Sequence, residues 1–314
     1  MIEFLTGAVF VGFLASTIRL AVPLIFASLG EVFTQRSGIL NLGLEGIMLI
    51  GSFIGFTAAN LSGNLWVGVL AGMLSGLMIA IVIAVFDVTL GADQTIVGIM
   101  IVIAAQGLVT YLNNVIYKGG YVPPRIGGFT PIRIPLLADI PVIGDTFFNQ
   151  NILVYIAFLL VPLFAVVLFK TTWGLRVRGV GEDPRSADAM GVNVFRTRYL
   201  ALLFGGMMAG LGGAFLTLGY LGTFNDNITA GRGWIAIALV YFGQWNPYRV
   251  LAGALLFGGV NALQLRLQAQ GANLPFQFML MLPYVLTILV LIGISREGRG
   301  PAALCVPYRR EVRT

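Results

Sequence analysis

The chain has 314 residues, of which 58% are hydrophobic and only 10% are charged, and its mean hydropathy is +0.91. A soluble protein carries about 25% charged residues, so this composition excludes an ordinary soluble enzyme or binding domain. The sequence has no histidine and a single cysteine, Cys305, which excludes histidine catalysis, histidine metal sites and an internal disulfide. We therefore expect one all-α polytopic membrane domain over residues 1–314, with lipid around it. The net charge of +6 does not predict a nucleic-acid partner, because the basic residues cluster in two segments.

Apolar runs of about 20 residues, each long enough to cross a bilayer as a helix, recur along the chain. They cover residues 4–29, 38–59, 65–86, 95–117, 151–169, 199–221, 228–245, 249–268 and 278–294. We expect about 8–10 transmembrane or re-entrant helices, because a run that breaks inside the membrane does not cross it. The side of the N-terminus depends on whether the first run, or its junction with the second, is broken.

That first junction, residues 30–46, reads GEVFTQRSGILNLGLEG. Irregular backbone at membrane depth is tolerated only where protein or a wet cavity satisfies its polar groups. Asn41 and Glu45 are four residues apart, which predicts one shared helix face. An ionisable residue inside an apolar run is a candidate functional group, so this face is predicted to line a substrate route. The alternative is a helix that begins at Ser37 and Gly38, in which Glu45 is bonded to a neighbour.

Two later runs carry ridges of small residues at every fourth position: Gly68, Gly72 and Gly76, and then Gly205, Ala209 and Gly213. In lipid, small residues allow helix backbones to approach closely. Both ridges therefore predict helix–helix packing, within the subunit or across a dimer.

Polar stripes lie within two apolar runs: Gln106 and Asn113 in 95–117, and Asn261, Gln264 and Gln268 in 249–268. In a membrane, such stripes must face protein or water. Interhelical hydrogen bonding and a substrate pathway both explain them. As pathway residues we predict Asn41, Glu45, Gln106, Asn113, Asn261 and Gln264.

A charged island, residues 170–198, interrupts the apolar pattern and reads KTTWGLRVRGVGEDPRSADAMGVNVFRTR. Asp183 and Pro184 are typical of a helix start, because aspartate caps free N–H groups and proline fits the first helical position. Gly191 is typical of the left-handed residue that ends a helix. A short capped helix between two spans predicts a docking site. Basic residues in the island and the C-terminal tail predict that both are cytoplasmic and that the loop 118–150 is external.

Catalytic chemistry finds no support in the sequence. A phosphate-binding loop needs Gly-Lys-Ser/Thr, but Lys118 and Lys170 each follow an aromatic residue. We therefore expect neither enzyme activity nor a cofactor or metal in this chain.

Four separated segments resemble a known transport family. QRSGILNLGLEGIMLIGSFIGF is similar to the signature of bacterial ABC-importer permeases that move simple sugars and nucleosides. GVGEDPRSADAMGVNVFRTRYLALLFGGMMAGLGGAF resembles the cytoplasmic coupling loop of that branch and the span after it. GRGWIAIALVYFGQWNP and MLPYVLTILVLIG resemble the nucleoside-type members most. The related branched-chain amino acid permeases share the architecture but differ at the NLGLEG block.

The resemblance implies a type II importer fold in the bacterial cytoplasmic membrane. It also implies a second, non-identical permease subunit, an external binding protein that delivers a nucleoside, and a cytoplasmic ATPase that uses ATP. The ATPase is expected to dock on the helix 184–190 through Asp183, Pro184, Arg185, Ala187, Asp188 and Gly191.

Three alternatives remain open. The first is a permease for a simple sugar of the ribose or galactose type. The second is an ion-gradient transporter built around Glu45, since Asp87 and Asp93 are predicted to lie at a cytoplasmic turn. The third is a purely structural subunit, against which the polar stripes argue.

Overall fold

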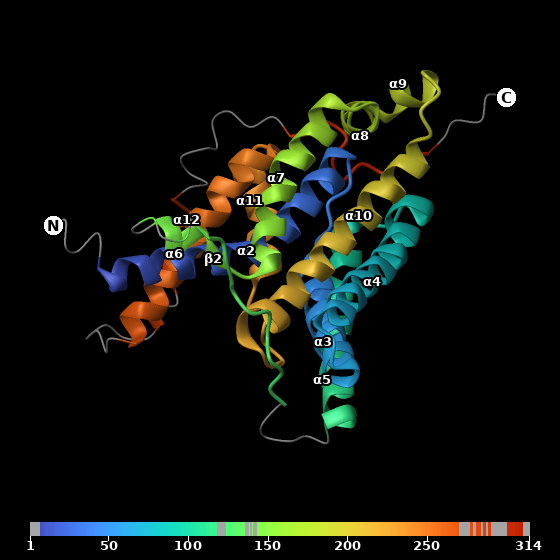
Figure 1. Ribbon diagram of the computed structural model, residues 1–314. Coiled ribbons are helices and arrows are strands. Elements are labelled where there is room, and N and C mark those ends of the chain that lie inside the picture. Colours follow the sequence, from blue (N-terminus) through green and yellow to red (C-terminus); the bar gives the residue numbers. More distant parts are fainter. Residues whose placement is uncertain are drawn as a thin grey trace.

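The computed structural model describes residues 7–117, 124–135, 138, 140, 143–269, 277–278, 281–283, 285–286, 288–289 and 300–309. The first helices are α2 (Ala8–Arg36), α3 (Leu44–Ser62), α4 (Leu65–Ala84), the π-helix η1 (Val85–Leu90) and α5 (Gln94–Tyr117). Next come β1 (Ile132–Arg133), α6 (Ile143–Phe147), β2 (Asn149–Gln150), α7 (Ile152–Lys170), α8 (Thr172–Glu182) and α9 (Pro184–Ala189). The last are α10 (Val194–Phe215), the π-helix η2 (Leu216–Leu221), α11 (Arg232–Phe242) and α12 (Pro247–Ala269) (Figure 1).

The described part of the chain is a helical bundle in which 7 helices are long and apolar enough to cross a membrane. The predicted all-α, multi-pass class is thereby confirmed. A small antiparallel pair, β1 with β2, places Ile132 opposite Gln150 within the stretch predicted as the external loop.

Two of the predicted spans differ in the structure. The run 38–59 becomes helical only at Leu44, because α2 continues to Arg36 and the chain then turns through Gly38, whose φ is +90°. The run 228–245 contains only α11, which at 11 residues measures about 16 Å at 1.5 Å per residue. A single crossing helix needs about 30 Å, so α11 is too short to cross the membrane by itself, and this run is one of those that do not form a continuous span. Most of the predicted run 278–294 lies outside the described residues.

Helix α10 lies at the centre of the bundle and packs against α4, α2 and α3 (Figure 1). Gly72 of α4 meets α10 so closely that an added Cβ would lie 2.7 Å from Cβ of Ala214. A Cβ on Gly76 would overlap the carbonyl oxygen of Gly206. The face of α10 that receives the α4 ridge is therefore Gly206, Gly210 and Ala214, one residue along from the ridge picked out in the sequence.

The ridge Gly205, Ala209 and Gly213 faces other helices. Gly205 lies against Thr34 of α2, and Gly213 lies against the carbonyl of Met48 in α3. Small residues thus let three helices approach α10 at once, and these contacts are all within the subunit.

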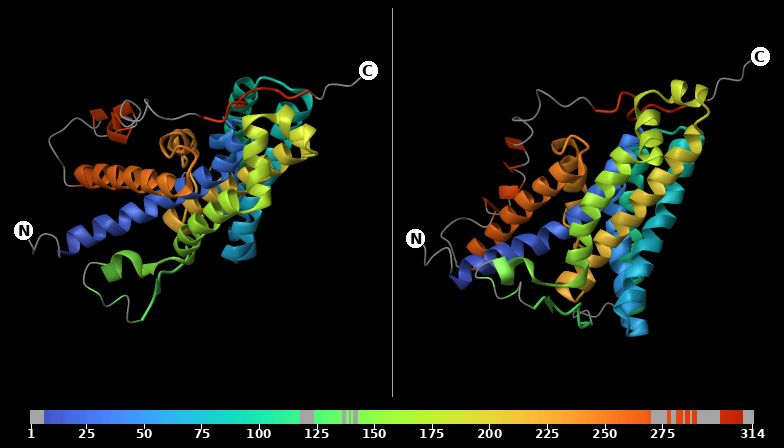
Figure 2. Two further views of the ribbon diagram at one scale, coloured as in Figure 1. Left: turned by 90° about the horizontal axis from the view of Figure 1, so that it is seen from above. Right: turned by 45° about the horizontal axis from the view of Figure 1, so that its top comes forward.

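The second group of contacts joins α2 to α12, which run side by side (Figure 2). An aromatic cluster joins the other side of α2 to α7, α8 and α10. The ring centroid of Phe33 lies 5.6 Å from that of Phe164, 5.3 Å from that of Trp173 and 5.1 Å from that of Phe204. Helix α2 therefore packs against other helices on two sides, and these contacts fix the position of its C-terminal end, where the helical path breaks.

Candidate functional site

Glu45 lies in the first turn of α3 and binds the N-terminus of α11. Its Oε1 accepts a hydrogen bond from the N–H of Gly231 at 2.9 Å, and its Oε2 accepts one from the N–H of Gly233 at 2.6 Å. Free N–H groups and a partial positive charge gather at a helix N-terminus, so a buried carboxylate satisfies both. A Cβ on Gly233 would lie 2.5 Å from Cα of Glu45, so glycine is what allows this approach. Both carboxylate oxygens of Glu45 are thus engaged in holding α11 against α3.

Asn41 lies before α3 begins, so the prediction that it shares a helix face with Glu45 is wrong. Its N–H donates to Oε1 of Glu31 at 3.1 Å, and the same oxygen accepts from Nε2 of Gln35 at 3.0 Å. The indole N–H of Trp245 donates to Oε1 of Gln35 at 2.8 Å. All four residues are buried, and the bonds from the main chain of Asn41 and the side chains of Gln35 and Trp245 join α2 to the break after it and to the segment that follows α11.

The two polar stripes have different surroundings. On α5, Gln106 is exposed, and the half-buried Asn113 donates from Nδ2 to Oδ1 of Asp226 at 3.0 Å. On α12, Gln264 is buried and Asn261 is half-buried. Helix α5 packs mainly against α3, whereas α12 packs mainly against α2. The predicted pathway residues therefore do not form a single cluster within one subunit.

Helix α9 projects at one end of the bundle (Figure 1). Asp183 caps it, since its Oδ1 accepts from the N–H groups of Arg185 at 3.0 Å and Ser186 at 3.2 Å. These bonds, with that from the Ser186 hydroxyl as the largest cause, lower the pKa of Asp183 below its usual value. Pro184 occupies the first turn, and Gly191 follows the helix with φ +84°. No residue of α9 is buried, and Met190, directly after it, is 85% exposed.

The C-terminal segment 300–309 lies beside the base of α9. The N–H of Ala303 donates to the carbonyl of Gly181 at 2.9 Å, at the end of α8. The N–H of Cys305 donates to the carbonyl of Gly38 at 3.1 Å, in the break between α2 and α3. Glu182 forms an ion pair with Arg36 at 3.8 Å. The segment therefore joins the helix pair α8–α9 to the break that leads to Asn41 and Glu45.

Arg198 completes this junction from α10 and is only 1% exposed. Its Nε donates to the carbonyl of Ser37 at 3.2 Å, and its Nη1 donates to the carbonyl of Val306 at 3.1 Å. A buried guanidinium is costly unless it is hydrogen-bonded, so these carbonyls determine its position.

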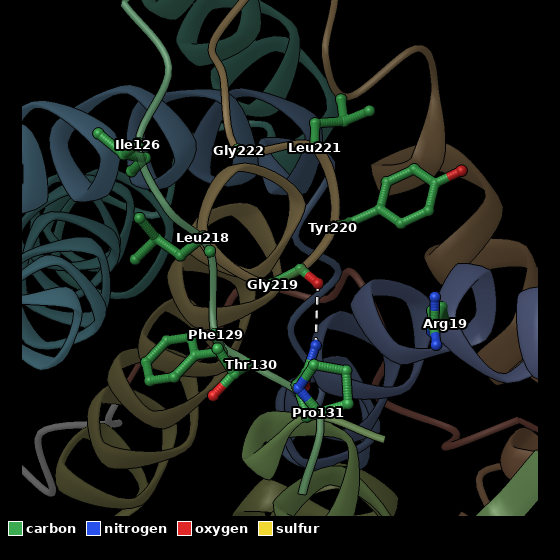
Figure 3. Close-up of a pocket in the computed structure, with 12 residues that line it drawn as sticks. Arg19, Ile126, Phe129, Thr130, Pro131, Leu218, Gly219, Tyr220, Leu221 and Gly222 are labelled. Atoms are coloured by element: carbon green, nitrogen blue, oxygen red, sulfur yellow. Dashed lines mark hydrogen bonds between the residues drawn. The ribbon is translucent and has the colours of Figure 1, made fainter. Parts of the chain in front are cut away.

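A cavity of about 440 Å³ lies between η2, α2 and residues 126–131 (Figure 3). It is at the opposite end of the bundle from α9, because η2 follows the far end of α10 (Figure 1). Polar side chains in its lining include Arg19, Thr130 and Tyr220, which have donors and an aromatic ring for a small polar solute. Asn151, also in the lining, donates from Nδ2 to the carbonyl of Gly219 at 2.9 Å. The Nε of Arg19 donates to Oε1 of Gln150 at 2.9 Å.

Asp87 also differs from its predicted position at a turn, because it is 1% exposed within η1. Asp93 does lie at the turn, where its carboxylate accepts from the N–H of Thr95 at 2.8 Å and starts α5. Among the described residues, no group of three or more histidine, cysteine or acidic side chains is placed to hold a metal ion.

Comparison with known families gives the bundle an identity. The family model described as the permease component of branched-chain amino acid transport systems matches residues 13–291. The chain belongs to this permease family. It is therefore a multi-pass membrane subunit of an ABC transporter, and such permease subunits are not themselves enzymes.

Three relatives cover nearly the whole permease. It is 37% identical to the guanosine ABC transporter permease protein NupQ of Bacillus subtilis, over 93% of this chain and 95% of that protein. It is 38% identical to the nucleoside permease protein NupC of Lactococcus lactis, over 94% of this chain and 95% of that protein. It is 39% identical to TsgC13 of Haloferax volcanii, which is assigned to glucose transport, over 96% of this chain and 98% of that protein.

The same three organisms each contain a second permease that carries the same substrate name and is less similar to this chain. The identities are 27% for guanosine over 79% of this chain, 27% for glucose over 89%, and 32% for nucleosides over 34%. The fold of the permease also matches a solved ABC transporter assigned to the metal-chelate type, in an inward-facing conformation. The TM-score is 0.53 at 15% identity, over 90% of this chain and 85% of the other.

Sequence reasoning missed the role of Arg198 and of the C-terminal segment. It placed Arg198 in the charged island together with Arg196. One local signal separates the two residues: Arg198 directly precedes the apolar run 199–221, whereas Arg196 does not.

Proposed function

We propose that this permease is half of a heterodimeric ABC importer that moves nucleosides inward by alternating access. An ATPase docks on α9 from the cytoplasm, and an external binding protein delivers the solute. ATP is bound and hydrolysed on the partner, so this chain needs no cofactor of its own.

The observation that carries the proposal is the contrast between α8 and α9. Helix α8 is anchored, with Val177 and Val180 buried, whereas α9 has no buried residue although it is well capped. A helix of six residues is marginal alone in water, so caps that keep it folded at an exposed position support a docking role. A push on α9 would act through α8, whose Gly181 lies against the carbonyl of Arg36 at the end of α2.

The pairs of relatives support two different permease subunits. In each of three organisms, one permease is 37–39% identical to this chain and a second one with the same substrate name is less similar. We therefore infer that this chain corresponds to one member of such a pair.

The substrate is proposed from the relatives: of the three described above at 37–39% identity, two carry nucleoside or guanosine names. Glucose is the second candidate, favoured by the 39% identity to TsgC13. Both solutes carry a ring with several hydroxyl groups, which amides and hydroxyls can bind without charge.

The test uses the complete importer, purified from its native membrane with its partners and reconstituted in proteoliposomes. We expect an ATPase and a second permease to copurify, and uptake of labelled guanosine that requires ATP. Recovery of the chain without an ATPase would contradict the importer. Uptake of glucose but not guanosine would transfer the assignment to the second candidate.

Docking on α9 is tested by Met190→Glu, with Leu61→Glu as a control, since Leu61 is 77% exposed at the other end of the bundle. If Met190 contributes about 1.4 kcal/mol to docking, Met190→Glu lowers ATP-driven uptake about tenfold. Equal uptake by the two variants at equal membrane abundance would contradict the assignment of α9.

A further inference from the structure

Helix α5 presents a continuous exposed stripe that the described part of the subunit does not cover. It consists of Ile96, Ile99, Ile103, Gln106, Thr110 and Asn114, all exposed and spaced by three or four residues. Such spacing places residues on one face of a helix. We call this face the α5 stripe.

The stripe changes character near the middle of the membrane. Gln106 lies about 18 Å along α5 from its first residue, which is past halfway across a hydrocarbon core of about 30 Å. Towards Gln94 the stripe is apolar, and towards Tyr117 it is polar. In the described part of the chain, the side chains of Gln106, Thr110 and Asn114 form no hydrogen bond with another residue.

Contact with lipid is energetically unfavourable for the polar half of the stripe, Gln106, Thr110 and Asn114. Leaving an amide without hydrogen bonds in an apolar environment costs about 1–3 kcal/mol by protein measurements. Polar side chains in membrane helices accordingly face protein or a wet cavity. Room is available there, because an added Cβ on Gly107 would meet nothing within 4 Å.

The stripe on α12 is arranged differently. Asn261 and Gln264 share a face with the buried Val250 and Phe257, which points into the subunit. Of the two polar stripes, the one on α5 therefore presents its side chains outward from the described part of the subunit, and the one on α12 does not.

We propose that the α5 stripe lines the solute path, with the second permease subunit on its other side. Gln106, Thr110 and Asn114 contact the hydrated solute, and Ile96, Ile99 and Ile103 pack against the second subunit and close the path towards Gln94. The inference rests on the proposed two-permease importer and adds the face of this subunit that meets the solute.

Cysteine accessibility tests this in the complete importer with Cys305→Ser, which removes the single native cysteine. Cysteine is introduced at Gln106, Thr110 or Asn114 and challenged with a charged, membrane-impermeant methanethiosulfonate. The matched controls are Leu108→Cys and Val115→Cys, which are exposed on the opposite face of α5. The reagent is added to whole cells and to inside-out vesicles, so the result does not depend on the orientation of the chain.

The reactive thiolate forms in water and not in lipid, so we expect labelling at the three polar positions to be about tenfold faster than at the controls. Ile99→Cys should resist the reagent when added from the Tyr117 side. Saturating guanosine or glucose should slow labelling at Gln106→Cys by about twofold or more, since a bound solute excludes reagent.

Labelling at Gln106, Thr110 and Asn114 no faster than at Leu108 and Val115 would overturn the proposal. If one of the three cysteine variants fails to insert into the membrane, the other two still test the proposal. Uptake of guanosine and glucose is measured on the same cells. Fast labelling without uptake of either solute would reject the proposed substrates and keep the path, whereas uptake with slow labelling would reject only the path.

Discussion

Nε of Arg198 donates a hydrogen bond to the carbonyl of Ser37 at 3.2 Å across 161 residues of sequence. The bond joins the start of α10, next to α9, to the turn that ends α2. Because α2 also packs along α12, a movement of α9 can be transmitted through the buried contacts of Arg198 to α2 and from there to α12.

Replacing Arg198 with Met is expected to destabilise the permease by about 1–3 kcal/mol, because the carbonyls of Ser37 and Val306 lose their donors. Arg196→Met is the control, since Arg196 is exposed two residues away. Thermal unfolding in detergent measures both. Equal midpoints for the two variants would show that the buried bonds contribute little.

Gly38→Ala should cost more than Gly191→Ala. Both glycines have positive φ, +90° and +84°, so each substitution carries about 1 kcal/mol of backbone strain. Only at Gly38 would the new Cβ also crowd neighbours, at 2.9 Å from Nη2 of Arg198 and 3.0 Å from the carbonyl of Ala303. The difference between their unfolding midpoints measures the crowding against Arg198 and the C-terminal segment, and no difference would argue that these neighbours move aside.

Glu45→Gln should lower stability by about 2 kcal/mol, because an amide replaces one acceptor oxygen with a donor facing the N–H groups of α11. Glu182→Gln is the control, since the Glu182 side chain is 55% exposed and its ion pair at 3.8 Å is worth little. Uptake per folded molecule distinguishes two roles for Glu45. If specific uptake is unchanged, Glu45 serves only to hold α11 in place. If substrate preference changes, Glu45 has the predicted pathway role.

Gly210→Val should prevent close packing of α10, since an added Cβ would overlap the carbonyl of Gly72. A cost of about 2 kcal/mol or more is expected from the overpacked contact. Gly179→Ala is the comparison, because nothing lies within 4 Å of its Cβ and alanine favours the helix α8. Membrane abundance and unfolding midpoints report both; a Gly210→Val protein as stable as Gly179→Ala would refute the close approach.

The cap of α9 should weaken in acid. The pKa of Asp183 is lowered in the folded protein, so its stabilisation is complete above the unfolded pKa of about 4 and is lost as pH falls through the lower folded value. Hydrogen exchange at the amides of Arg185 and Ser186 should accelerate over that range. Asp183→Asn, which caps without a charge, should remove the pH dependence, and an unchanged dependence would exclude Asp183 as its source.

The sequence by itself determined the class and the local signals. Long apolar runs must satisfy their backbone groups internally, so they form helices whatever their neighbours. The cap at Asp183 and the turn at Gly191 involve atoms within a few residues, and they could be predicted for the same reason. The family followed from short segments whose residues are adjacent in the chain.

Only the tertiary structure decided which polar groups meet. Asn41 and Glu45 lie four residues apart yet bind Glu31 in α2 and the N-terminus of α11, because the helix begins between them. Arg198 is buried where carbonyls from two distant segments reach it, whereas Gln106 is exposed on α5. Burial is a property of partners more than a hundred residues away in sequence, so neither the α5 stripe nor the junction at Arg198 can be located from periodicity alone.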